Sequence, residues 1–170
     1  MLDRYRLRAW LFLFVIPLVF PAAGWTQTTV SSAERTLLDA ANRDRKAQGL
    51  PLLRWNEALA DAARKHAQRM AQQDSLSHQL SGEPNLSARV IEAGVRFTWV
   101  AENVGEGFSV SEIHEQLMRS PAHRAGILDP ELECVGIGVA EHNGRWFAAE
   151  DFLRRDSTSA QARKLVAASP

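Results

Sequence analysis

The segment from Cys134 to Phe152 constrains the fold most, because it carries the pattern of a β-hairpin. Apolar residues alternate with small ones from Cys134 to Ala140, a period of two that is typical of a strand with one closely approached face. Asn143-Gly144 follows, which is a strong signal for a two-residue hairpin turn, and Trp146 to Phe152 is the predicted return strand. The C-terminal half is therefore expected to form an antiparallel sheet.

The residues before this hairpin carry helical patterns instead. Two predicted helices begin with a Ser-x-x-Glu capping box, in which the serine and the glutamate each satisfy a free backbone amide. The sequence contains no internal repeat, so the pattern favours one α+β domain with helices packed on an antiparallel sheet. The predicted helices run from Ser31 to Gly49, from Asn56 to about Met70, from Leu86 to Ala93 and from Ser109 to Ser120.

The first 24 residues have the layout of a secretory signal peptide. Arg4, Arg6 and Arg8 precede a stretch without charge, and small residues follow where a peptidase could cut. The alternative is an uncleaved membrane anchor, but two prolines interrupt the apolar stretch. Without residues 1–24 the chain has 17 basic and 19 acidic side chains, a net charge of −2, which gives no indication of nucleic-acid binding. Residues 154–170 are small and polar, and we expect a disordered tail there.

The single cysteine, Cys134, cannot form an internal disulfide, so the domain must depend on its hydrophobic core. Its apolar, glycine-rich surroundings predict a buried, inert thiol, because no nearby cation or helix start would lower its pKa. The sequence also contains no Gly-x-Ser-x-Gly motif. Acyl transfer through a serine or cysteine nucleophile therefore has no support.

Three polar segments, expected outside the regular elements, contain His78, Glu102 and His123. Two histidines, one carboxylate and a water molecule form a ligand set that suits zinc. The three residues are 24 and 21 positions apart, and no short metal motif joins them. From spacing alone, scattered surface residues remain the alternative.

The other three histidines are predicted to have structural roles. His114-Glu115 begins like the zinc-protease helix motif, but Met118 stands where that motif needs its second histidine. We therefore expect His114 and Glu115 to be solvated helix residues. His66 falls on the apolar face of its helix and is predicted to lie in the core, whereas His142 is predicted to be a turn residue.

Six segments, taken in chain order, resemble the CAP superfamily, which comprises the cysteine-rich secretory, antigen 5 and pathogenesis-related 1 proteins (the SCP domain). The resemblance covers Leu37 to Phe152, within a domain expected at residues 31–153. A disulfide-free chain with the pattern Ser-Pro-Ala-His-Arg-Ala-Gly-Ile-Leu is similar to the bacterial branch. The segments are Leu53–Ala60, Ser77-His78, Ala101–Gly105, Met118–Leu128, Val135–Val139 and Trp146–Phe152.

The resemblance implies an α-β-α sandwich with a central antiparallel sheet and a large groove that holds two histidines and two acidic residues. His78, Glu102 and His123 match three of these positions, and Ser120 stands at the fourth, where many family members have an acid. The three residues are therefore candidate ligands for zinc or another divalent cation, and Asn103 and Ser120 are candidates to orient a ligand. The alternative is a polar cluster that binds no metal and ties helices to the sheet through hydrogen bonds.

Two functions follow as expectations. The first is an exported, periplasmic or secreted, non-enzymatic module whose groove holds a lipid, sterol, peptide or envelope component. The second is a zinc-dependent hydrolase or peptidase with a metal-bound water as nucleophile. The first is favoured, because no second carboxylate is placed to act as a general base. A third interpretation is a role in envelope maintenance or defence without a small ligand.

Overall fold

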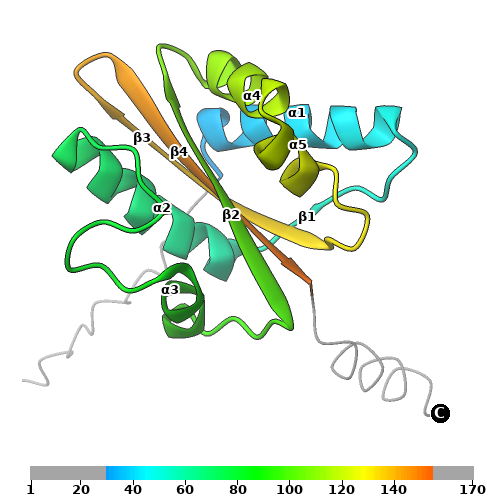
Figure 1. Cartoon of the computed structure of the whole chain (residues 1–170), viewed down its shortest axis with the longest axis horizontal. Helices are drawn as coiled ribbons and strands as arrows, with labels where there is room; N and C mark the ends of the chain where they lie inside the picture. The colour runs from blue at the N-terminus through cyan, green and yellow to red at the C-terminus, as the bar shows by residue number, and fades with distance from the viewer. Residues whose placement is uncertain (1–29, 155–170) are drawn as a thin grey trace, which may run out of the picture.

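The computed structural model describes residues 30–154, which form a four-stranded sheet between two layers of helices (Figure 1). The leader and residues 155–170 lie outside the described residues. The elements in chain order are α1 (Ser32–Ala47), β1 (Arg54–Trp55), α2 (Glu57–Gln73), α3 (Leu86–Glu92), β2 (Trp99–Gly107), α4 (Val110–Arg119), α5 (Pro121–Ile127), β3 (Cys134–His142) and β4 (Arg145–Arg154).

The strand order is β1-β3-β4-β2, so the last strand of the sequence lies in the interior of the sheet. β4 pairs antiparallel with β2 on one side and with β3 on the other. The short β1, which the sequence pattern did not predict, pairs parallel with β3. The predicted hairpin is confirmed, and both residues of its turn, Asn143 and Gly144, have the positive φ values that a two-residue turn requires.

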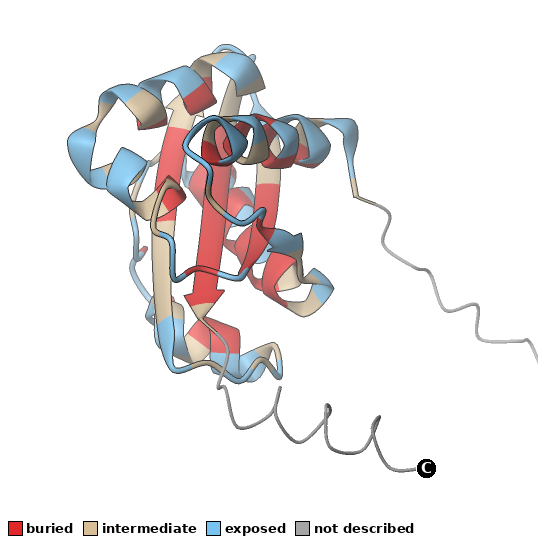
Figure 2. Ribbon diagram, turned by 90° about the vertical axis from the view of Figure 1, so that its right-hand side faces the viewer, coloured by how far each residue is buried: buried red, intermediate tan, exposed pale blue. Residues whose placement is uncertain are grey.

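Helices α2 and α3 cover one face of the sheet, and α1, α4 and α5 cover the other (Figure 1). Side chains of β4 alternate between the two cores: Ala148 and Phe152 pack with α1 and α4, while Phe147 and Ala149 pack with α2. Buried residues accordingly concentrate along the strands and on the inward faces of the helices (Figure 2). The expected α-β-α sandwich is confirmed.

Capping residues in the sequence determine where the helices begin. Ser31 and Glu34 form the predicted capping box, with bonds of 3.2 Å from Glu34 N to Ser31 Oγ and 2.8 Å from Ser31 N to Glu34 Oε2. At α4 only half of the predicted box forms, because the Glu112 carboxylate accepts the amide of Phe108 rather than that of Ser109. None of the helices between residues 30 and 154 combines the length and apolarity that a membrane span requires.

Two segments that were expected outside the regular elements are regular. Ala101 to Gly105 belongs to β2, and the residues after Ser120 form α5. The prediction missed β2 because its polar residues hide the alternation, although Val104 and Gly105 do point to opposite faces. A proline at the first position of α5 fits a helix start, since its missing amide would be unpaired there in any case.

Candidate functional site

The exposed imidazole of His78 contacts the buried carboxylate of Glu102, where the loop after α2 meets β2. His78 Nδ1 is 3.0 Å from Glu102 Oε1. The His78 side chain is 61% exposed, whereas the Glu102 side chain is 2% exposed. The structure therefore brings together two of the three candidate ligands, and the second ring nitrogen of His78 is left available.

Arg89 of α3 holds the other oxygen of Glu102. Its Nη2 lies 2.5 Å from Glu102 Oε2, and its side chain is only 6% exposed. Arg89 Nη1 also lies 3.3 Å from Glu83 Oε2, so one buried guanidinium faces two carboxylates. Because a guanidinium stays charged at all accessible pH values, it compensates their negative charge permanently.

His66 of α2 completes this buried network. Its Nδ1 is 2.8 Å from Glu83 Oε2 and its Nε2 is 2.8 Å from the carbonyl oxygen of Ser77. An ionised Glu83 carboxylate and a carbonyl oxygen are both acceptors, so the two ring nitrogens of His66 lie between two acceptor groups. The predicted core position of His66 is confirmed, and its ring joins Glu83 to the loop that precedes His78.

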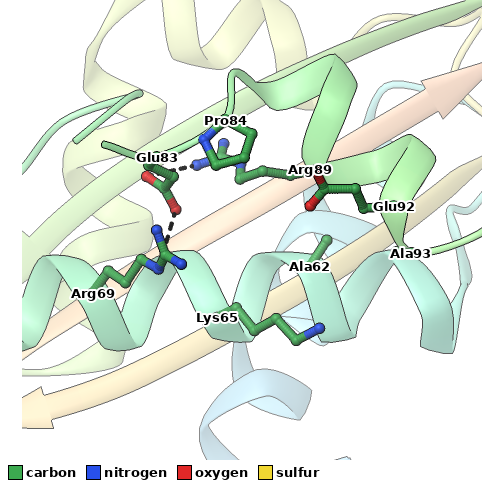
Figure 3. A pocket seen from close by; sticks show the side chains of 8 residues that line it. All are labelled: Ala62, Lys65, Arg69, Glu83, Pro84, Arg89, Glu92 and Ala93. Carbon is green, nitrogen blue, oxygen red and sulfur yellow. Dashed lines mark ion pairs between the residues drawn. The ribbon is translucent and has the colours of Figure 1, made fainter. Parts of the chain in front are cut away.

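Glu83 is held in its ionised form despite its burial. Burial alone would raise the pKa of Glu83, but the hydrogen bonds from His66 and from the backbone amide of Leu80, with the charges of His66 and Arg89, lower it below its ordinary value. Figure 3 shows Glu83 between Arg69 and Arg89, at the wall of a cavity of about 70 Å³ between α2 and α3. His66, Glu83, Arg89 and Glu102 thus form a buried group of two basic and two acidic side chains, which we call the ion quartet.

Asp151 lies beside the quartet on β4, directly opposite Glu102 in the strand register. It is fully buried, and neither of its carboxyl oxygens has a hydrogen-bond partner among the described residues. Burial raises the pKa of Asp151 well above its ordinary value, and the negative charge of Glu102 raises it further. The charge of Arg89 opposes this rise, and Asp151 is the carboxyl group of this cluster whose ionisation burial disfavours most.

Asn103, next to Glu102 on β2, points to the opposite face of the sheet. Its Nδ2 donates to the carbonyl oxygen of His123 at 3.2 Å and lies 3.5 Å from Glu150 Oε2. Glu150 is fully buried, and burial raises its pKa to about 7 against a small opposing effect of the Asn103 hydrogen bond. Asn103 therefore ties β2 to the start of α5.

His123 and Ser120 lie on this second side. His123 is a half-buried residue of α5, and no hydrogen bond or ion pair joins its ring to His78 or Glu102 in the part of the chain that the structure describes. Ser120 caps α5 by its position, but its side chain makes no capping hydrogen bond.

The arrangement of these side chains bears directly on the zinc expectation. Within residues 30–154 no group of three or more His, Cys, Asp or Glu side chains is arranged to hold a metal ion. One oxygen of Glu102 is also already bound by Arg89. As they lie, these residues do not fit a resident metal centre, and zinc binding by His78, Glu102 and His123 stays a prediction.

The prediction for His114 was wrong. His114 is buried, and its Nε2 lies 2.7 Å from Asp44 Oδ2, which joins α4 to α1. The signal was available in the sequence, because His114 continues the three-and-four spacing of Ile113 and Leu117. Glu115 is exposed, as predicted.

An apolar hollow lies at the connection between α3 and β2. Its volume is about 580 Å³, and Ile91, Gly94, Val95, Arg96 and Phe97 line it. Of its three large apolar lining residues, Ile91 is the exposed one, at 63%, and Val95 and Phe97 are half-buried. Sequence reasoning missed this hollow, because it depends on how α3 packs.

The chain matches a protein-family model and is similar in sequence to a bacterial protein. The model of the family described as "CAP: Cysteine-rich secretory protein family" matches residues 38–153. The uncharacterized protein YkwD of Bacillus subtilis is 28% identical over 120 residues, which are 70% of this chain and 47% of YkwD. The chain thus spans about half the length of that relative.

Two solved structures are similar to the described domain. An extracellular protein of Bacillus anthracis that contains an SCP domain has a TM-score of 0.66 and 25% identity, over 71% of this chain and 40% of that one. An outer surface protein from Borrelia burgdorferi has a TM-score of 0.69 at 16% identity, over 75% of this chain and 96% of that one. The second likeness is one of fold alone.

Proposed function

The chain belongs to the cysteine-rich secretory protein (CAP) family, and from that premise we propose that it is an exported, non-enzymatic module that binds a lipid or sterol. The apolar hollow beside α3 carries this proposal. Its lining combines the exposed Ile91 with the half-buried Val95 and Phe97, and a concave, largely apolar surface is typical of a ligand site. A peptide or another envelope component is the alternative occupant.

Export is supported by the signal-peptide pattern of residues 1–24. The B. anthracis relative is itself described as extracellular. Mass spectrometry of the chain recovered from the periplasm or the medium should give a mature N-terminus near residue 25. A full-length chain in the membrane fraction would instead support the uncleaved anchor.

A matched pair of variants tests the ligand. Ile91→Asp places a charge at the hollow, whereas Leu52→Asp places one at a similarly exposed leucine, 55% exposed, outside the hollow lining. We expect native mass spectrometry to find co-purified lipid on the wild type and on Leu52→Asp but not on Ile91→Asp. Titration with a fluorescent fatty acid and a fluorescent sterol should likewise show binding by the wild type and by Leu52→Asp but not by Ile91→Asp. Equal binding by all three proteins would refute the proposal.

A zinc-dependent hydrolase is the second candidate, favoured by the contact between His78 and Glu102. It predicts a hydrolytic activity proportional to bound zinc, which both His78→Ala and His123→Ala abolish. Ligand binding that is unchanged by a chelator and by both substitutions would favour the metal-free module.

A further inference from the structure

The two oxygens of Glu102 have different neighbours. Oε1 contacts the exposed His78, while Oε2 faces inward to Arg89 at 2.5 Å and to His66 Nε2 at 3.7 Å. Because Arg89 binds Oε2, Oε1 is the oxygen that faces a ligand at His78, although the carboxylate is almost fully buried. Glu102 could therefore coordinate a cation at His78 through one carboxylate oxygen rather than two.

Arg89 is fixed in this position. It projects from α3, and its almost fully buried guanidinium lies between Glu102 and Glu83. The Arg89-Glu102 contact is a charge-assisted hydrogen bond, the strong class of such bonds. The negative charge that would attract a cation to Glu102 is thus already compensated inside the protein.

We propose that Arg89 is the built-in counter-cation of Glu102 and keeps the zinc affinity of the His78-Glu102 pair low. A divalent cation on His78 would share the Glu102 carboxylate with a permanent positive charge and would be repelled by it. Ser120 is uncharged and supplies no second negative charge to offset this. This inference goes beyond the proposed ligand binding, because it concerns Arg89, which does not line the hollow, and it holds whatever ligand the hollow binds.

Zinc titration of the purified protein tests it, with affinity measured by calorimetry in ZnCl2. Arg89→Met removes the charge and should raise zinc affinity roughly tenfold or more, the size of effect that groups around a metal ligand produce. Arg89→Lys keeps the charge and should stay close to the wild type. Adding His78→Ala to Arg89→Met should abolish the gain, which a purely structural role of Arg89 would not predict.

Arg69→Met is the matched control. Arg69 also approaches the quartet, but at 4.0 Å from Glu83 and with a half-exposed side chain, so its loss should leave zinc affinity unchanged. Wild-type protein that holds one zinc with the affinity of Arg89→Met would overturn the inference, as would a gain that survives His78→Ala.

If circular dichroism shows that Arg89→Met does not fold, NMR of the wild type gives the answer. Millimolar ZnCl2 should shift the His78 ring signals progressively, as expected for weak, fast exchange, and slow exchange at one equivalent of zinc would overturn the inference. Lipid binding is scored separately by native mass spectrometry with a chelator present, so failure of one proposal is not failure of the other.

Discussion

Gly138 of β3 lies directly against Arg64 of α2: a Cβ atom built on Gly138 would be 2.1 Å from the backbone nitrogen of Arg64. Two residues earlier on the strand, a Cβ on Gly136 would be 2.2 Å from the backbone nitrogen of Ala60. Helix and strand therefore pack backbone against backbone along this stretch. The closely approached strand face that the sequence predicted is this contact.

Gly138→Ala should destabilise the domain by roughly 3 kcal/mol, because helix backbone cannot move aside as a flexible side chain can. Urea unfolding followed by circular dichroism measures this. Gly82→Ala is the control: its Cβ would meet open space, and only its positive φ opposes the change, at about 1 kcal/mol. Equal effects at the two glycines would contradict the close packing.

His66→Ala should cost roughly 3–5 kcal/mol, because it leaves Glu83 buried with part of its charge uncompensated. His78→Ala removes an imidazole that is mostly in water and should change the free energy of unfolding by about 1 kcal/mol or less. Thermal unfolding of the two variants separates these roles. A His66→Ala protein as stable as His78→Ala would show that the ion quartet does not stabilise the fold.

Glu150→Gln should change how stability depends on pH. With a pKa of about 7 in the folded protein and an ordinary value of 4.5 after unfolding, the stabilising neutral form of Glu150 is fully effective below pH 4.5. Its contribution is lost as the pH rises through 7, by about 3 kcal/mol in all. Glutamine stays neutral and can still accept from Asn103, so the difference in unfolding free energy between variant and wild type should grow from pH 5 to 8. A constant difference would place the pKa of Glu150 near its ordinary value.

Asp151→Asn and Glu83→Gln should have opposite effects at pH 8. The raised pKa of Asp151 means that ionisation is costly there, so the neutral asparagine should be at least as stable as the wild type. The lowered pKa of Glu83 means that its charge is stabilising, so Glu83→Gln should lose roughly 3 kcal/mol. Chemical denaturation at pH 8 compares them directly, and a loss at Asp151 as large as that at Glu83 would contradict the assignment.

The sequence predicted the elements whose signals are local. Ser31 with Glu34, Asn56 before α2 and the Asn143-Gly144 turn each act within a few residues, and each was confirmed. Cys134 was correctly placed in a buried strand because its neighbours alternate. These features depend on backbone geometry that neighbouring residues determine by themselves.

The ion quartet could not be predicted in the same way. Arg89 meets Glu102 only because α3 docks on the face of β2, and no local pattern gives that docking. Glu150 and Asp151 are adjacent acids in a strand, and the sequence predicted the strand without indicating that both faces are covered. His78 and Glu102 were grouped with His123 from their polar segments and from the family resemblance, and the structure joins only the first two.

Because β4 lies in the interior of the sheet, the sheet cannot be completed before the end of the domain has been synthesised. Ribosomes and export channels release a protein from its N-terminus, so α1, α2 and the first strands emerge while the strand between β2 and β3 is still missing. Neither neighbour can complete its hydrogen-bonded ladder until Arg145 to Arg154 has appeared. The sheet is therefore completed only at the end of synthesis, and a chain that ends before Arg145 keeps at most the short β1–β3 pairing and lacks the strand that joins β2 to β3.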